Sequence, residues 1–163
     1  LSIEYDENYN IFQFYDVRVC TTMRSFCCYG FVYIDDSILF FGGYDGIKNA
    51  SREVHRYSIV HDQWIKFELT LPMPLNCCVA TLSKDNRCVH VIGGYDEHDT
   101  LSTHMKIILQ KWTSETRIER EWIKKEKKIR YIEEIEKEKK EIEMMNEELS
   151  IMEQQQLDIR KLK

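Results

Sequence analysis

The chain has 163 residues, of which 43% are hydrophobic, and a formal net charge of −5. A slightly acidic balance of this kind offers no attraction to a polyanion, so we expect no nucleic-acid partner. The printed sequence contains neither a signal peptide nor an uninterrupted apolar run of about 18 residues. We therefore expect no membrane partner and a cytoplasmic setting with reduced thiols.

Residues 1–22 lack a complete copy of any motif found downstream, but they are rich in aromatic side chains. Phe14 lies 50 positions before Trp64, the large aromatic residue near the end of the next segment. Because aromatic residues recurring at one interval indicate a repeated unit, we predict that residues 1–22 are the end of an earlier copy.

Residues 23–67 carry the pattern of four short strands. β-Branched and aromatic residues, which strands favour, are concentrated at 27–34, 37–41, 54–59 and 64–67. The apolar run 37–41 stops at Gly42 and Gly43, where a side chain would block either a positive φ or a close backbone approach. We therefore predict a four-stranded antiparallel unit with a polar loop after the two glycines.

Residues 73–112 repeat this pattern. A second apolar run ends at Gly93 and Gly94, and Gly93 follows Gly42 by 51 positions. We expect strands at 77–82, 88–92 and 103–109, with a fourth beginning at Trp112. Other residues recur at nearly the same interval: Met73, Cys77 and Cys78 follow Met23, Cys27 and Cys28 by 50 positions, and Trp112 follows Trp64 by 48. Agreement of several features at one interval indicates a repeated sheet unit.

The double glycines, together with a tyrosine separated from Trp64 by six residues, resemble the kelch repeat. The resemblance covers residues 1–112 and implies a mainly β fold, namely a partial β-propeller. It would contain about two four-stranded antiparallel blades, at 23–67 and 73–112, and the remnant 1–22. The structural motif residues that it implies are Gly42, Gly43, Tyr57, Trp64, Gly93, Gly94 and Trp112. The second blade departs from the pattern, because Met105 occupies the place of the tyrosine.

Two blades are too few to close a ring, since propellers contain about 4–8 blades. The outer faces of an open pair would meet water instead of neighbouring blades. The chain also begins with Leu1 rather than methionine. We therefore expect a fragment of a longer protein, and a ring completed by other chains is the alternative.

The composition changes abruptly after Trp112. Residues 114–163 contain no Gly, Pro or Cys and have a net charge of −1, against −4 for residues 1–113. Glu, Lys and Met favour helices, so we predict a long charged helix over 114–163. Ser114 is the expected N-cap, and Glu115 suits the positive end of the helix dipole.

Apolar residues recur along this predicted helix at alternating spacings of three and four. They are Ile142, Met145, Leu149, Met152 and Ile159, with Gln156 in the same series. Because this spacing is that of a coiled-coil seam, we predict self-association over residues 118–162. The alternatives are a lone helix held by its own salt bridges and a segment that folds on contact with a partner.

The titratable and nucleophilic residues show no pattern of catalytic or metal chemistry. The six cysteines form no Cys-x-x-Cys pair, the five histidines are scattered, and no phosphate-binding glycine loop is present. Adjacent cysteines in each copy are explained as small strand residues, one of each pair facing the core. We therefore expect no catalytic residue, no metal site, no cofactor and no enzymatic activity.

The resemblance to kelch repeats implies a module that binds a protein partner, unidentified here, through loops at one rim. The corresponding loops are 44–52 and 95–102. The candidate contact residues are Tyr44, Asp45, Arg52, Tyr95, Asp96 and His98. They combine aromatic anchors with charges, as binding hot spots do, whereas the alternative is that the tyrosines and aspartates pack and cap the turns. A ubiquitin-ligase substrate-recognition subunit and an actin- or cytoskeleton-associated crosslinker are the other functions that the resemblance allows.

Overall fold

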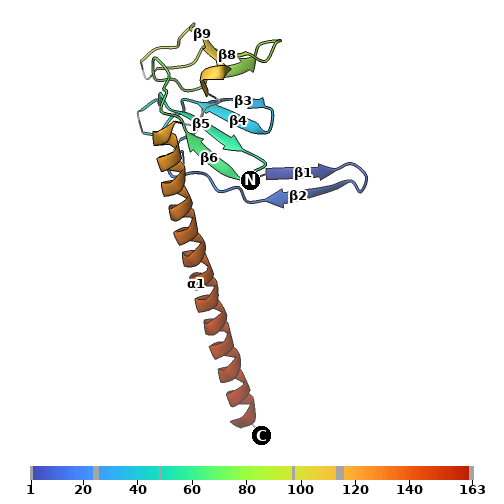
Figure 1. The fold of residues 1–163 in the computed structure, drawn as a ribbon. Helices are drawn as coiled ribbons and strands as arrows, with labels where there is room; N and C mark the ends of the chain where they lie inside the picture. Colours follow the sequence, from blue (N-terminus) through green and yellow to red (C-terminus); the bar gives the residue numbers. More distant parts are fainter. Residues whose placement is uncertain (1, 24–25, 48, 97, 113–115, 162–163) are drawn as a thin grey trace. The chain divides into compact units, whose positions relative to one another are not determined.

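The computed structural model of the chain describes residues 2–23, 26–47, 49–96, 98–112 and 116–161. Two compact units make up the chain, Leu1–Ile123 and Lys124–Lys163. The described residues form antiparallel sheets followed by one long helix, as predicted (Figure 1). The strands are β1 (Ser2–Asp6), β2 (Ile11–Tyr15), β3 (Gly30–Ile34), β4 (Ser37–Phe41), β5 (Val54–Ser58), β6 (Gln63–Lys66), β7 (Val79–Leu82), β8 (Cys88–Ile92) and β9 (His104–Ile108).

The four-stranded sheet has the order β3-β4-β5-β6, so each strand pairs with its neighbour in sequence. This confirms the four strands predicted within residues 23–67, although the first is shorter than the predicted 27–34. The tight connections need left-handed residues, and aspartates supply them: Asp35 has a φ of 50° and Asp62 a φ of 43°. Aspartate tolerates this conformation better than most residues do.

The second sheet has three strands, in the order β7-β8-β9. The fourth strand predicted at Trp112 is wrong, because a 3₁₀ helix (Leu109–Trp112) follows β9 directly. Three residues per turn bring Leu109 and Trp112 to the same side, and both side chains are buried. The Trp112 ring packs edge-on against Phe67, with ring centroids 4.8 Å apart. Burial of this indole in the core therefore takes the place of a fourth strand.

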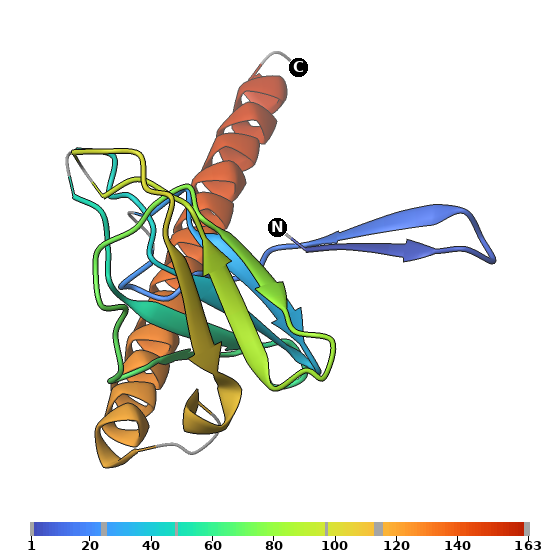
Figure 2. The ribbon, with the colours of Figure 1, turned by 90° about the horizontal axis from the view of Figure 1, so that it is seen from above.

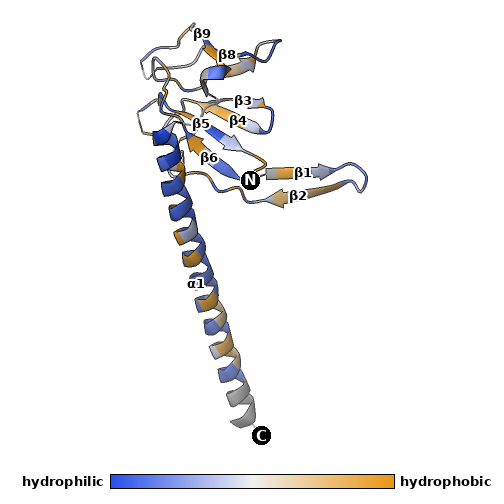
Figure 3. Ribbon diagram, viewed as in Figure 1, coloured by the Kyte–Doolittle hydropathy of each residue, from blue (hydrophilic) through white to orange (hydrophobic). Residues whose placement is uncertain are grey.

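The hydrophobic core lies between the two sheets. Residues of alternating positions on each strand face it, as the pleat requires, and Figure 3 shows hydrophobic residues along these strands. Its buried members are Leu39, Phe41, Val54, Phe67, Leu71, Leu75, Cys78, Val89, Val91, Leu109 and Trp112. Part of each opposite face is open to water, as predicted for a pair of blades: Phe31 is 63% exposed and Val79 is 64% exposed.

The first double glycine allows the two sheets to approach each other. All four glycines have a positive φ, from 64° at Gly93 to 117° at Gly43. A Cβ at Gly42 would collide with the carbonyl oxygen of Leu75, and the N–H of Gly43 donates to that same oxygen at 2.8 Å. Both reasons predicted for glycine at this place are therefore confirmed, since a side chain is excluded by the backbone conformation and by the lack of space.

Just before the first strand of each sheet, equivalent residues of the two copies are 49 positions apart, rather than the 50 predicted from the paired cysteines. Cys28 and Cys77 occupy equivalent positions, with φ values of 53° and 52°. Cys27 pairs with Tyr44 through the backbone as Asn76 pairs with Tyr95. The prediction that one cysteine of each adjacent pair faces the core is right for Cys78 and wrong for Cys27 and Cys28, which are both exposed.

The β1–β2 hairpin has the local geometry of the β5–β6 hairpin. In each hairpin the hydroxyl of a tyrosine donates to a turn side chain: Tyr5 to Asn10 and Tyr57 to Asp62, both at 2.9 Å. Asn10 has a positive φ of 54°, like its counterpart in the other turn. The two hairpins therefore share their turn conformation and the bond that closes it.

The aromatic pairs of these hairpins also correspond. Tyr5 stacks on Phe12 with centroids 4.6 Å apart, and Tyr57 packs on Trp64 with centroids 4.9 Å apart. The counterpart of Trp64 is thus Phe12 rather than the predicted Phe14. This correspondence supports the interpretation of residues 1–22 as the end of an earlier copy, which stays a prediction.

Helix α1 (Arg117–Lys161) begins with a reciprocal pair of capping bonds. The N–H of Glu119 donates to the Thr116 hydroxyl at 3.2 Å, and the N–H of Thr116 donates to the Glu119 carboxylate at 2.9 Å. This is a capping box, and it satisfies two backbone donors that a helix start leaves unpaired. The predicted N-cap Ser114 and its neighbour Glu115 lie outside the described residues. Glu119 also accepts the N–H of Glu68 at 3.0 Å, which ties the helix start to the end of the four-stranded sheet.

The rest of α1 confirms the predicted long charged helix. Its 45 residues extend about 68 Å at about 1.5 Å per residue. Ion pairs four residues apart line it, among them Arg130–Glu134 and Lys137–Glu141. Within the described part of the chain, no helix has the length and apolar character needed to span a bilayer.

The first prediction concerns the close approach at Gly42. We expect Gly42→Ala to lower the free energy of unfolding by about 1–3 kcal/mol more than Gly46→Ala, because only the former adds a collision to the backbone strain. Gly46 has a φ of 82° and no atom within 4 Å of an added Cβ. Urea unfolding followed by tryptophan fluorescence measures both, and equal costs would contradict the packing described.

Candidate functional site

The two predicted partner loops leave the same end of the stacked sheets (Figure 2). Residues 44–52 lead from β4 to β5, and residues 95–102 lead from β8 to β9. Equivalent backbone bonds close them: the N–H of Ser51 donates to Gly43, and the N–H of Leu101 donates to Gly94, both at 2.8 Å. The two loops are therefore closed by the same backbone hydrogen bond at equivalent positions.

The aspartates of these loops accept hydrogen bonds from backbone N–H groups of their own loops. The Asp45 carboxylate accepts the N–H of Ile47 at 2.9 Å and the N–H of Asn49 at 3.0 Å. The Asp96 carboxylate accepts the N–H of Asp99 at 2.9 Å and that of His98 at 3.1 Å. These donated bonds, chiefly the one from Asp99, hold the pKa of Asp96 below its usual value. Both carboxylates therefore cap turns, which is the alternative that the sequence allowed for them.

The other four candidate residues differ in exposure. Tyr44 is half-buried and exchanges two backbone bonds with Cys27, at 2.8 and 2.9 Å. Tyr95, Arg52 and His98 are exposed. Of the six candidate residues, one tyrosine, one arginine and one histidine therefore lie at the surface of the loops, while Tyr44 and the aspartates hold the loop backbone in shape.

The motif residue Trp64 belongs to a second apolar cluster, on the outer face of the four-stranded sheet, and Tyr57 packs against it. Trp64 packs with Cys20 and Met23, and its indole N–H donates to the carbonyl of Arg18 at 2.7 Å. Trp122 from the start of α1 packs against the same cluster. The chain before β3 and the first turns of α1 therefore both cover this face.

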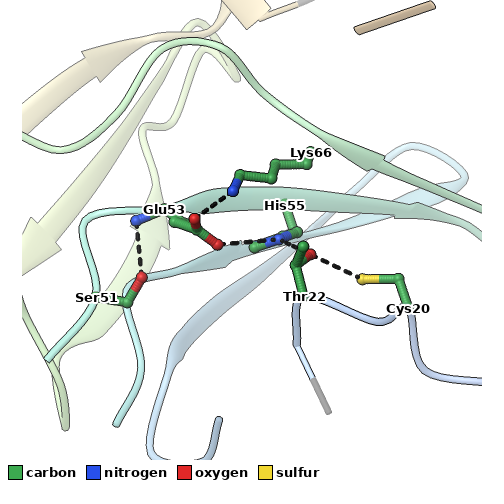
Figure 4. A network of polar contacts seen from close by, with 6 residues as sticks. All are labelled: Cys20, Thr22, Ser51, Glu53, His55 and Lys66. Atoms are coloured by element: carbon green, nitrogen blue, oxygen red, sulfur yellow. Dashed lines mark hydrogen bonds and ion pairs between the residues drawn. The ribbon is translucent and has the colours of Figure 1, made fainter. Parts of the chain in front are cut away.

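A polar network that sequence analysis missed lies beside this cluster (Figure 4). His55 is 2% exposed, and its Nε2 lies 2.8 Å from the hydroxyl of Thr22. The Glu53 carboxylate lies 3.6 Å from the same nitrogen and forms an ion pair with Lys66. The thiol of Cys20 lies 3.6 Å from the Thr22 hydroxyl. The network joins the segment before β3 to the neighbouring strands β5 and β6.

Burial, with a smaller effect of the Lys66 charge, lowers the pKa of His55 to about 3. The imidazole is therefore neutral at neutral pH. Thr22 and Glu53 both approach Nε2, so the carboxylate does not orient the far ring nitrogen as it does in a hydrolase triad. This geometry suits a structural bond between segments. No sequence signal links Thr22 to His55, because the two residues are 33 positions apart and belong to no common pattern.

A family model for the kelch motif matches residues 25–67, the segment that holds the four-stranded sheet and its double glycine. The kelch motif predicted for this segment is therefore confirmed. Residues 25–67 therefore carry a kelch motif, and such motifs are typical of protein-binding modules. A search of curated proteins found no significant match to the chain.

The second prediction concerns His55 and pH. Its folded-state pKa of about 3 lies below the usual 6.5. The unfolded chain therefore binds the extra proton first, and stability is complete above about pH 6.5 and falls as the pH drops toward 3. We expect a contribution of about 1.4 kcal/mol per pH unit in this window.

Urea unfolding of the full chain at several pH values tests this, with His55→Gln compared with the parent. The variant should lose this part of the pH dependence, whereas His61→Gln, at an exposed turn position, should keep it. Parallel curves for the parent and His55→Gln between pH 6.5 and 4 would show that the imidazole is not buried as described.

Proposed function

We propose that the chain is a non-catalytic protein–protein interaction scaffold. The observation that carries this proposal is the pair of loops 44–52 and 95–102, closed by equivalent backbone hydrogen bonds at the same end of two stacked sheets. A partner that spans both loops meets a surface fixed by backbone bonds, so little conformational entropy is lost when it binds.

The side chains exposed on these loops suit a protein partner. Tyrosine and arginine are the residues enriched at binding hot spots, and Tyr95 and Arg52 are the exposed examples here. The exposed His98 adds a third polar contact. The chemistry favours a partner segment that offers an apolar or aromatic group for Tyr95 and carboxylates for Arg52.

The helix supplies the second half of the proposal, which is self-association. The seam residues Ile142, Met145, Leu149 and Met152 are each 52–55% exposed, so their apolar surface is accessible. The side chains of Gln156 and Ile159, the remaining seam positions, lie outside the described residues. Two copies joined along this seam would present four loops, and the second binding event would then become intramolecular and strengthen overall binding.

The third prediction tests the loops. We expect Arg52→Ala/Tyr95→Ala to abolish the capture of a defined set of proteins from a cell extract. The matched control Tyr9→Ala/Arg87→Ala removes an exposed tyrosine and an exposed arginine elsewhere and should keep that set. Quantitative mass spectrometry of the captured proteins compares the two, with circular dichroism confirming folding. Equal loss in both variants, or in neither, would refute binding through these loops.

The fourth prediction tests the helix. We expect the full chain to be a dimer in light scattering coupled to size exclusion. Met145→Lys/Met152→Lys should convert it to a monomer, because charges at seam positions cannot be buried. Met144→Lys/Ile151→Lys changes residues of similar exposure outside the seam and should leave the dimer intact. A monomeric parent chain would favour the lone charged helix instead.

A further inference from the structure

The two stacked sheets meet at a pair of cysteines in equivalent positions. Cys28 and Cys77 each lie two residues before the first strand of their sheet, and β3 and β7 lie side by side. Both residues have a left-handed backbone, with φ values of 53° and 52°. The N–H of Cys77 donates to the carbonyl of Cys28 at 2.6 Å. This bond crosses directly from one sheet unit to the other.

The thiols of this pair interact as well. Both side chains are exposed, so small reagents in solution can reach them. Partial desolvation, and then a hydrogen bond from the Cys28 thiol, raises the pKa of Cys77. The Cys28 thiol forms a similar bond with Cys27 and raises the pKa of that residue too. Cys28 is therefore the shared neighbour in a group of exposed thiols.

The backbone geometry suits a covalent bond between the two residues. Disulfides join residues with Cα atoms about 4.4–6.8 Å apart. The backbone hydrogen bond from the Cys77 N–H to the Cys28 carbonyl, at 2.6 Å, brings these two residues directly together. We propose that Cys28 and Cys77 form a reversible disulfide across the seam between the two sheets, by exchange with a low-molecular-weight disulfide such as oxidised glutathione.

The exchange proceeds in two balanced steps. The thiolate of one cysteine attacks a sulfur of oxidised glutathione, so that a mixed disulfide forms, the glutathione S–S bond breaks and one glutathione thiolate leaves. The thiolate of the second cysteine then attacks the protein sulfur of the mixed disulfide and expels the second glutathione thiolate. Both departing thiolates take up the protons that the cysteines released. The two cysteines are oxidised, and one glutathione disulfide is reduced to two thiols.

Other pairings are less well placed. Cys78 is buried in the core, where an incoming disulfide cannot reach it. Cys27 is held by two backbone bonds to Tyr44 on its own sheet unit. Cys28 and Cys77 are the exposed pair joined directly by a backbone bond across the seam. Their disulfide would close a loop over residues 28–77, which contains the Gly43–Leu75 bond. Closing this loop lowers the conformational entropy of the unfolded chain, so the melting temperature should rise.

The test uses the full chain, incubated folded with oxidised glutathione at about pH 8 to favour the thiolates. Peptide mapping by mass spectrometry without reduction should find a peptide pair joined through Cys28 and Cys77. The melting temperature should rise by several degrees and return to its starting value when dithiothreitol is added.

Three variants distinguish this pair from its neighbours. Cys28→Ser and Cys77→Ser should each lose the linked peptide and the rise in melting temperature, whereas Cys27→Ser should keep both. A chain that carries only glutathione adducts would overturn the proposal. So would a linked peptide that survives in Cys28→Ser, because the bond would then run through Cys27.

Discussion

The stacked sheets depend on the close approach of Gly42 and Gly43 to the backbone at Leu75. The N–H of Gly43 donates to the Leu75 carbonyl, and no side chain fits between them. This contact fixes the distance at which the two sheets bury Phe41, Val89 and the rest of their common core. The same glycines turn the chain into the loops, so one constraint sets both the packing and the place where a partner could bind.

Two segments cover part of the outer face of the four-stranded sheet: the chain before β3 and the first turns of α1. Trp64 lies between the chain before β3 and Trp122 of α1. Beside it, neutral His55 bonds to Thr22 and thus fastens the same segment. The capping box of Thr116 and Glu119 fixes where the helix begins. Hydrophobic cover and a few buried polar bonds therefore replace part of the contact that a neighbouring blade would provide.

Features that local sequence patterns determine could be predicted, whereas features that depend on contacts between distant segments could not. Strand β4 was predicted with its observed bounds because an apolar run between turn residues marks it. The place of Trp112 was missed, because its burial against Phe67 depends on the other sheet. The candidate loops were found from the double glycines, but only the structure shows that Asp45 and Asp96 are used as turn caps. The Thr116 capping box was a readable signal that the prediction overlooked.

Native-state hydrogen exchange tests the central claim, that backbone bonds between the sheets make them one cooperative unit. The amides of Gly43 and Cys77 donate from one sheet unit to the other, to Leu75 at 2.8 Å and to Cys28 at 2.6 Å. The account predicts that both exchange with the same free energy of opening as amides within β4 and β8, because the sheets would open only together. Exchange of both amides as fast as that of the exposed β1–β2 hairpin, while β4 stays protected, would contradict it.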